Sequence, residues 1–232
     1  MTKMKNRIRI ILPLCLLLFG SCITTKVIRE DTEWSDFWWS HESDVSKPRV
    51  LFIGNSITRG YYPAVSEKLA EKANCDRYST SRSIEDLALL QETKIAMGKY
   101  NHTVIHFNNG LHGWHLTGEQ YEEGLRKFVR FLIAQKSRDC KLVYSLTTPV
   151  SSKEPGVKLD SERNTIVMER NSIALKVMKE NGIQVIDLYG LMEPELEKYN
   201  SSKGDLHYKR EGYELMADHI SREILKLIEN RK

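Results

Sequence analysis

The sequence predicts an α/β fold in which helices cover both faces of a parallel β-sheet. Two observations predict this fold class. Short apolar runs rich in β-branched residues recur along the chain, and longer stretches with apolar residues at helical spacing separate them. Because strands that alternate with helices form parallel sheets buried on both faces, we expect a three-layer α/β/α sandwich. The 232 residues suffice for one domain with a sizeable core.

Five runs are predicted to be strands, which gives a five-stranded parallel sheet. The first, 49–54, reads Arg-Val-Leu-Phe-Ile-Gly and is predicted to be buried. The second, 77–80, has the weakest pattern of the five. The remaining runs are mostly apolar and β-branched, and they cover 103–107, 141–146 and 183–188.

Helical stretches are predicted between and after these strands. Apolar residues recur at helical spacing from Tyr121 to Leu132 and from Ile173 to Met178. Thr117 forms a capping-box pattern with Gln120, which predicts that the first of these helices begins there. The last helix carries its apolar residues on one face, and they are Tyr213, Met216, Ala217, Ile220, Ile224 and Leu227.

The first 22 residues have the pattern of an export signal rather than of a folded segment. A basic stretch precedes an apolar core of roughly 10 residues, well short of the ~20 that span a bilayer. The core ends in Leu18-Phe-Gly-Ser-Cys22, which resembles a bacterial lipoprotein cleavage box. That resemblance implies a lipidated Cys22 and an exported bacterial lipoprotein, periplasmic or at the cell surface, held to a membrane only by its lipid. The alternative is an ordinary signal peptide with an incidental cysteine.

The formal net charge of +4 originates in this leader. Residues 1–21 contain four basic side chains and no acidic one, so the chain without them is close to neutral. A nucleic-acid partner needs a basic face that neutralises phosphates, and this composition gives no support for such a partner.

Residues 23–47 are predicted to form a polar tether ahead of a domain that covers 48–232. The tether carries an aromatic cluster, made of Trp34, Phe37, Trp38 and Trp39. Because a free linker would not carry three tryptophans, we expect this segment to fold back onto the domain. Packing against the domain is one interpretation of the cluster, and a surface on which sugars stack is the other.

The candidate catalytic residues lie in two stretches about 150 residues apart. Gly54-Asn55-Ser56 places a hydroxyl where the first strand turns into a helix, and Asp205 and His207 stand just ahead of the last helix. A nucleophilic serine needs a base beside it and a group that orients the base. The chain offers all three in the order Ser, Asp, His.

Two other uses of the first stretch are excluded by its sequence. No glycine stands two residues after Ser56, so the stretch is not the Gly-x-Ser-x-Gly elbow. No glycine-rich run leads into Lys-Ser or Lys-Thr, which excludes a P-loop.

The two stretches resemble the first and last blocks of the GDSL/SGNH hydrolase family, which read Gly-Asp-Ser and Asp-x-x-His. The resemblance covers the chain from Arg49 to the C-terminal helix. It implies a flavodoxin-like SGNH fold with strand order 2-1-3-4-5, and acyl transfer to water through an acyl-serine without a cofactor. It also implies that Ser56 is the nucleophile, with Asn55 in place of the usual Asp, and that His207 is the general base.

The last block departs from the family pattern in its spacing. Asp205 stands two residues before His207 instead of three. Two groups therefore remain candidates for orienting the histidine, namely the Asp205 carboxylate and a backbone carbonyl.

The resemblance also implies an oxyanion hole built from backbone N–H groups and one asparagine. The N–H groups are those of Ser56 and of Ser81, which stands at the position of the family's glycine. The asparagine has two candidates. Asn108 fits variants that read Phe-Asn-x-Gly-Leu-His, and Asn109 fits a gap-free match to Gly-x-Asn-Asp. Asn108 is the preferred one.

Four further side chains are candidates for substrate contact, with packing as the alternative. Arg59 and Tyr61 follow the nucleophile, and His112 and Trp114 follow the candidate asparagines. Metal binding is a rival use of this region, because His102, His106, His112 and His115 lie close together in the sequence. No cysteine or acidic residue stands nearby to complete a site, so we predict no metal.

The sequence therefore predicts a lipid-anchored serine esterase of SGNH type whose substrate is an acylated small molecule or glycan. The resemblance, together with the absence of a lid-like apolar insertion, favours O-acetyl groups on carbohydrates. One alternative is a non-catalytic glycan-binding protein with the same fold, motivated by the altered second block and the short Asp-His spacing. A lipase or thioesterase of the same family is another.

Cys75 and Cys140 are predicted not to form a disulfide, although export would place them in an oxidising compartment. The implied strand order puts their strands three positions apart, or roughly 14 Å at about 4.8 Å per strand. A disulfide needs Cα atoms within about 7 Å.

Overall fold

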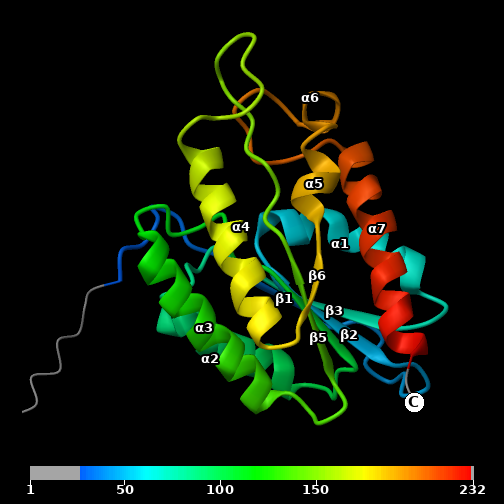
Figure 1. Ribbon diagram of the computed structural model, residues 1–232. Coiled ribbons are helices and arrows are strands. Elements are labelled where there is room, and N and C mark those ends of the chain that lie inside the picture. The colour runs from blue at the N-terminus through cyan, green and yellow to red at the C-terminus, as the bar shows by residue number, and fades with distance from the viewer. Residues whose placement is uncertain (1–26, 231–232) are drawn as a thin grey trace, which may run out of the picture.

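The computed structural model describes residues 27–230, and these contain a six-stranded sheet between two layers of helices (Figure 1). The strands are β1 (Ser35–Trp38), β2 (Arg49–Gly54), β3 (Asn74–Thr80), β4 (Val104–Phe107), β5 (Lys141–Ser145) and β6 (Gln184–Ile186). They lie in the order β1-β3-β2-β4-β5-β6, and β2 to β6 are parallel. The predicted α/β/α fold and the order 2-1-3-4-5 of its five strands are confirmed. The leader and Cys22 lie outside the described residues.

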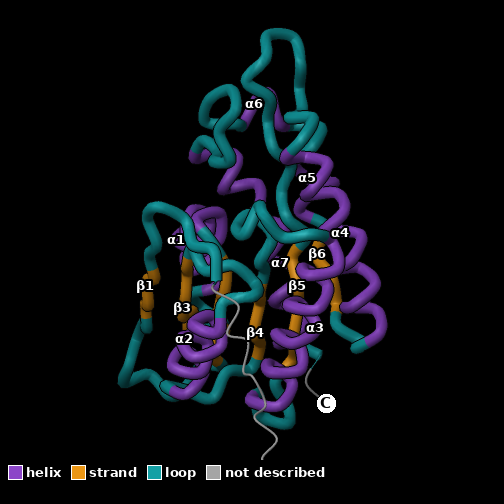
Figure 2. Tube along the Cα trace, turned by 90° about the vertical axis from the view of Figure 1, so that its left-hand side faces the viewer, coloured by secondary structure: helices purple, strands orange, loops and turns teal. Residues whose placement is uncertain are grey.

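The sheet has one strand more than predicted. β1 arises from the segment predicted to be a tether, and it pairs antiparallel with β3 at the edge of the sheet (Figure 2). Phe37 fills this junction by stacking on Tyr78 at 4.8 Å and on Trp39 at 5.5 Å between ring centroids. A strand of four residues within a polar segment has too short a pattern to be recognised from the sequence.

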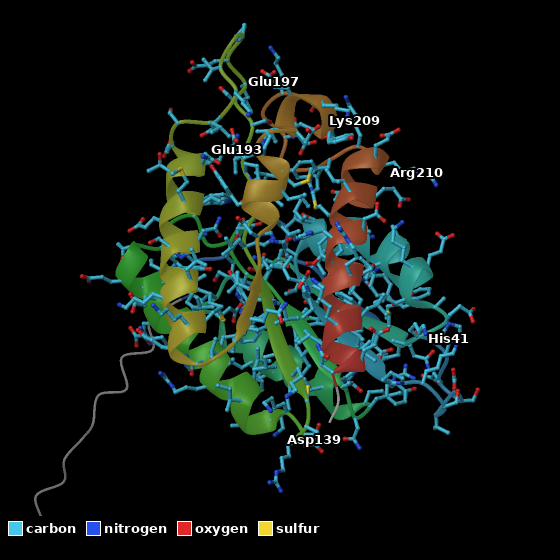
Figure 3. All side chains as sticks on the ribbon, turned by 45° about the vertical axis from the view of Figure 1, so that its right-hand side comes forward. His41, Asp139, Glu193, Glu197, Lys209 and Arg210 are labelled. Atoms are coloured by element: carbon cyan, nitrogen blue, oxygen red, sulfur yellow. The ribbon has the colours of Figure 1, made fainter. Side chains whose placement is uncertain are left out.

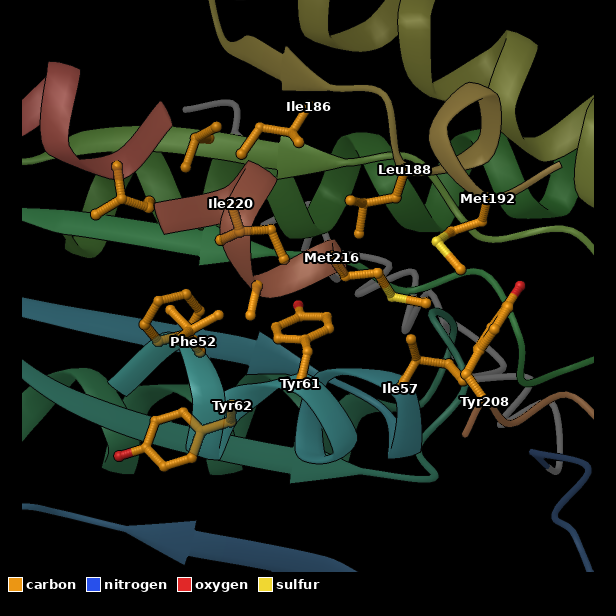
Figure 4. Close-up of a cluster of buried hydrophobic side chains, with 14 of the residues drawn as sticks. Phe52, Ile57, Tyr61, Tyr62, Ile186, Leu188, Met192, Tyr208, Met216 and Ile220 are labelled. Carbon is orange, nitrogen blue, oxygen red and sulfur yellow. The ribbon is translucent and has the colours of Figure 1, made fainter. Parts of the chain in front are cut away.

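Alternate residues of the central strands point to opposite helical layers. Val50 and Phe52 of β2 pack in one apolar cluster with α1 and α7, and Figure 4 shows part of it. Leu51 and Ile53 pack in a second cluster with α2, α3 and α4. The helices are α1 (Ser56–Leu69), α2 (Leu87–Gly98), α3 (Gly118–Gln135), α4 (Arg163–Glu180), α5 (Leu188–Met192), α6 (Leu196–Tyr199) and α7 (Arg210–Glu229). Within the described part of the chain, none of them is long and apolar enough to cross a bilayer.

The start of α3 confirms the predicted capping box. The Gln120 N–H donates to the Thr117 hydroxyl at 3.2 Å, and the Thr117 N–H donates to the Gln120 side-chain oxygen at 3.0 Å. These two hydrogen bonds satisfy N–H groups that the first turn leaves without helical partners.

The five parallel strands end at one edge of the sheet, where ligand sites of open α/β sheets form. Figure 3 shows the two ends of the molecule. Asp139, just before β5, lies at one end, and Glu197, Lys209 and Arg210, around α6 and the start of α7, lie at the other. The loops that follow β2, β3, β4 and β5 converge on this second end with the segment that precedes α7.

The two cysteines lie on different parts of the sheet. Cys75 is on β3 and Cys140 immediately precedes β5, three positions away in the strand order, as the prediction required. Both are buried thiols. Burial raises the pKa of Cys75 to about 12, so this sulfur is a protonated core group.

Candidate active site

Ser56 is the first residue of α1 and lies just past the end of β2. Asn55 caps the helix, since its Oδ1 accepts the N–H of Ile57 at 2.9 Å. Position 54 has no room for a side chain, because a Cβ there would overlap the Thr58 hydroxyl, and Gly54 is therefore required. This turn fixes the partly exposed Ser56 side chain at the carboxyl edge of the sheet.

His207 lies between α6 and α7 and contacts Ser56 from 151 positions away in the sequence. Its Nε2 atom is 2.9 Å from Ser56 Oγ, and its Nδ1 atom is 2.8 Å from Oδ1 of Asp205. The same carboxylate oxygen accepts the backbone N–H of His207 at 3.1 Å. The two-residue spacing thus lets one carboxylate oxygen hold both the ring and the main chain of His207. Nδ1 of His207 therefore contacts the Asp205 carboxylate and not a backbone carbonyl, which was the other candidate for orienting the ring.

Asp205 has a second partner that the sequence did not reveal. Ser201 Oγ donates to Oδ2 of Asp205 at 2.5 Å. Burial by itself would raise the pKa of Asp205, but the hydrogen bonds from Ser201 and from the backbone and ring of His207 outweigh it and lower this pKa to about 2. The carboxylate is therefore ionised throughout the range in which a histidine acts as a base.

The loop that carries Asp205 and His207 is held by two buried polar side chains. The Asn200 amide donates to the carbonyls of Asp205 and His207, both at 3.0 Å. The Ser151 hydroxyl accepts the Gly204 N–H at 2.9 Å. Because these partners lie up to 53 positions apart, no local sequence pattern points to them.

Ser81 does not provide a free oxyanion donor in this structure, which corrects the sequence prediction. Its backbone N–H donates to the Trp34 carbonyl at 3.0 Å, and its hydroxyl accepts the Trp34 N–H at 2.9 Å. Residue 34 lies just before β1, and the prediction did not anticipate this strand. The N–H of Ser81 is therefore occupied by its hydrogen bond to the segment that leads into the edge strand β1.

The two candidate asparagines differ in how many of their amide hydrogens are already bound. Asn108 Nδ2 donates to the Ser145 carbonyl at 2.8 Å and to the Thr147 hydroxyl at 3.1 Å, which uses both hydrogens. Asn109 Nδ2 donates to the Arg82 carbonyl at 2.9 Å, and no second acceptor is present among residues 27–230. The hydrogen bonds therefore favour Asn109 as the oxyanion donor, whereas the sequence favoured Asn108.

Comparisons with known proteins add to this geometry. No protein-family profile matches the sequence, and no curated protein matches it. A GDSL-like lipase from Bacteroides thetaiotaomicron is 16% identical, with a TM-score of 0.59 over 77% of this chain and 88% of its own. An acetylxylan esterase from Geobacillus stearothermophilus is 14% identical, with a TM-score of 0.61 over 76% and 94%. A second acetyl xylan esterase is 17% identical, with a TM-score of 0.61 over 76% and 99%.

The chain has the SGNH hydrolase fold. Within this SGNH fold the predicted nucleophile, base and acid lie in contact with one another at the carboxyl edge of the sheet. The structural similarity to these neighbours establishes the fold.

A buried arginine supports the loop after β4 and was missed from the sequence. Arg170 of α4 donates to the carbonyls of Gly110, His112 and Gly113 at 3.0, 2.9 and 2.6 Å. These carbonyls follow Asn109 directly, so the arginine fixes the segment that carries the candidate oxyanion donor. The signal was present in the sequence, because Arg170 stands among apolar residues on the buried face of its helix.

Three of the four predicted substrate-contacting residues lie near this edge, but each already has a partner. Arg59 lies 3.5 Å from Asp36, and its Cζ is 5.7 Å from the centroid of the Trp34 ring. His112 Nδ1 is 2.8 Å from Glu30. Trp114 is partly buried beneath the Arg170 guanidinium, at 5.4 Å from the ring centroid.

The fourth, Tyr61, is a core residue, and its predicted substrate contact is wrong. Its side chain is only 1% exposed, it packs in the cluster shown in Figure 4, and its hydroxyl bonds to Thr58 at 3.0 Å. Tyr61 lies four residues after the buried Ile57, which places both on the same face of α1.

The four histidines near β4 lie in separate environments. His106 is fully buried and contacts the Ser145 hydroxyl at 2.5 Å, and burial lowers its pKa to about 3. His102 contacts Asp76 at 3.0 Å, and His115 contacts Glu85 at 2.7 Å. Among residues 27–230 no group of three or more His, Cys, Asp or Glu side chains is arranged to hold a metal ion.

Proposed function

We propose that this protein is a serine esterase that hydrolyses acyl esters, with O-acetyl groups on carbohydrate as its substrate class. The observation that carries the proposal is the unbroken line of contacts from Ser56 Oγ through both ring nitrogens of His207 to Asp205. This is the arrangement that activates a serine hydroxyl. The substrate class is supported by the acetylxylan esterases among the proteins of similar fold.

The contacts assign a role to each member of this line. His207 Nε2 accepts the hydroxyl proton as Ser56 Oγ attacks the ester carbonyl carbon, and Asp205 stabilises the imidazolium that forms. The tetrahedral intermediate then expels the alcohol, which takes the proton from His207. Water attacks the acyl-serine with His207 again acting as base, and the carboxylic acid and free Ser56 are released.

The oxyanion needs hydrogen-bond donors that have no other acceptor. The N–H of Ser56 is one, because the first turn of a helix leaves it without a helical partner. The second amide hydrogen of Asn109 is the other. Removing one such donor typically costs on the order of 10²–10³ in rate.

A glycan-binding protein that lacks catalysis is the second candidate, and one observation favours it. The Ser81 N–H, at the position of a family oxyanion donor, is already bound to Trp34. Such a protein would bind acetylated glycans and leave their esters intact. A lipase or thioesterase would instead cleave long acyl esters or acyl thioesters.

A hydrolysis assay separates these candidates. The purified protein without its leader is offered p-nitrophenyl acetate, acetylated xylo-oligosaccharides, long-chain p-nitrophenyl esters and acyl thioesters. We expect acetate release that is abolished in Ser56→Ala and retained in Ser202→Ala, since Ser202 is exposed and nearby. Labelling of wild type but not of Ser56→Ala by a fluorophosphonate identifies the nucleophile. No hydrolysis and no labelling would support the glycan-binding protein.

We propose further that Cys22 is the lipidated N-terminal residue of the exported protein. The support is the sequence around it, Leu18-Phe-Gly-Ser-Cys22. In a bacterial host, the wild type is expected in the membrane fraction with incorporated labelled fatty acid, and Cys22→Ser is expected without the label. Equal labelling of the two proteins would refute the assignment.

A further inference from the structure

The N-terminal segment, residues 27–38, borders the candidate site along two of its loops and along the start of α1. Glu33 pairs with Arg82 in the loop after β3. Glu30 contacts His112 in the loop after β4 at 2.8 Å. Asp36 lies 3.5 Å from Arg59, which stands three residues after Ser56 on α1. A segment predicted to be a tether is thus joined to the loops that surround the nucleophile.

Trp34 is the residue of this segment that lies level with Ser56. In the parallel pair β2–β3, Gly54 is opposite Ser79, so Ser56 and Ser81 both stand two residues past the register pair at the same edge. The main chain of Trp34 is hydrogen-bonded to Ser81 and lies one strand position further from β2 than Ser81 does. Two strand spacings of about 4.8 Å place the main chain of Trp34 roughly 10 Å from the main chain at the end of β2, where Ser56 follows.

Trp34 is partly exposed, and the cationic side chain beside its ring is exposed as well. The Arg59 guanidinium lies 5.7 Å from the ring centroid, near the ~6 Å limit of a cation–π contact, and its side chain is 58% exposed. Arg59 therefore lies beside the ring, near the limit of a cation–π contact.

The other aromatic residues of the cluster point elsewhere. β1 runs antiparallel to β3, from Ser35 opposite Thr80 to Trp38 opposite Arg77, so each successive residue lies further from the site edge. Trp38 is four residues, or about 13 Å, beyond Trp34. Phe37 and Trp39 stack on each other. Only Trp34 of this cluster lies at the level of the nucleophile.

We propose that Trp34 and Arg59 form a sugar-binding platform beside Ser56. The indole face packs against the C–H face of a pyranose ring, and the guanidinium donates hydrogen bonds to its hydroxyl groups. The inference rests on the proposed esterase function, and it adds that the ester is recognised through a glycan that carries it. The platform is built from the segment before β1 and from α1, and it lies outside the Ser56, His207 and Asp205 contacts.

Substitution of Trp34 tests the platform with two substrates of different size. The main-chain groups of Trp34 make the bonds to Ser81, so Trp34→Ala keeps these bonds. We expect kcat/KM for an acetylated xylo-oligosaccharide to fall roughly tenfold, mainly through KM, which corresponds to about 1.4 kcal/mol. The kcat/KM for p-nitrophenyl acetate should stay within twofold. Trp34→Phe should recover part of the loss.

Trp38→Ala is the matched control, because Trp38 ends the strand that follows Trp34 and is 55% exposed. It should leave both substrates unchanged. Equal losses on the two substrates in Trp34→Ala, no loss on either, or the same loss in Trp38→Ala would overturn the platform.

A wild type that hydrolyses neither substrate would instead refute the esterase proposal. Calorimetric binding of the same oligosaccharide then decides the platform separately. Binding that is lost in Trp34→Ala supports the platform, and equal or absent binding in the two proteins overturns it.

Discussion

The Ser201 hydroxyl donates a 2.5 Å hydrogen bond to Oδ2 of Asp205, while the His207 ring contacts Oδ1 of the same carboxylate at 2.8 Å. The two partners hold opposite oxygens of the carboxylate, so its plane and its direction are both fixed. This second anchor accounts for how an aspartate two residues from the histidine orients the ring.

Ser201→Ala is expected to lower kcat about tenfold, because a hydrogen bond to a charged group contributes about 1.5–3 kcal/mol. Losing a donor to the ionised carboxylate also raises the pKa of Asp205 above its present value of about 2. Because the carboxylate stays ionised where a histidine acts as a base, the loss is expected in kcat at neutral pH. Ser202→Ala is the control, and a Ser201→Ala variant with the kcat of wild type would remove Ser201 from the mechanism.

Asp205 is expected to matter nearly as much as His207, since its carboxylate contacts the ring directly. The two-residue spacing in the sequence had left a backbone carbonyl as the alternative group that orients His207. Asp205→Asn should reduce kcat on the order of 10³-fold or more by favouring the wrong histidine tautomer. His207→Ala should cost as much as Ser56→Ala, because residues that act as a unit are not additive. An Asp205→Asn variant within tenfold of wild type would show that another group orients the ring.

The sequence predicted the elements whose signals are local. Both bounds of β2 follow from an apolar run that ends in Gly54, and the Thr117 cap marks the start of α3. β3 was predicted from residue 77 but begins at Asn74, because the run contains Asp76. That buried carboxylate is compensated by Arg49 at 2.7 Å and His102 at 3.0 Å. Such distant partners leave no periodic pattern.

The site shows the same division between local and distant signals. Ser56, Asp205 and His207 were identified because each belongs to a short block of recognisable spacing. The use of the Ser81 N–H was not foreseen, because its acceptor, the Trp34 carbonyl, lies 47 positions away, just before a strand that has no recognisable pattern. The burial of Tyr61 agrees with its helical spacing to the buried Ile57, a pattern that favours the packing alternative over substrate contact.

His106 is expected to make stability depend on pH, since burial lowers its pKa from 6.5 to about 3. Between these two values the unfolded chain binds the proton and the folded chain does not. The contribution of His106 to the free energy of unfolding is fully present above pH 6.5, and it falls as the pH drops toward 3. The loss should reach about 2 kcal/mol between pH 7 and pH 5.

Urea unfolding at pH 7 and pH 5 measures this contribution. His106→Gln should lose about 2 kcal/mol less than wild type on acidification, because glutamine does not titrate. His219→Gln is the control on α7, where the residue is only partly buried, and it should keep the wild-type dependence. The same acid sensitivity in wild type and His106→Gln would contradict the assignment.

Arg170 is expected to support both stability and catalysis. It is 1% exposed and donates to three carbonyls in the loop that follows Asn109, including Gly113 with its φ of +67°. Arg170→Met leaves buried carbonyls without donors, so unfolding free energy should fall by about 3–5 kcal/mol.

Arg170→Lys separates the charge from the geometry of the guanidinium. A single ammonium cannot reproduce the fork that reaches all three carbonyls, so we expect a loss of about 2 kcal/mol and a reduced kcat on p-nitrophenyl acetate. The reduced kcat follows because the loop that presents Asn109 is no longer fixed. Arg130→Lys, at an exposed position on α3, should change neither quantity. Urea unfolding and initial rates measure both, and an Arg170→Lys protein with wild-type stability and kcat would refute this role.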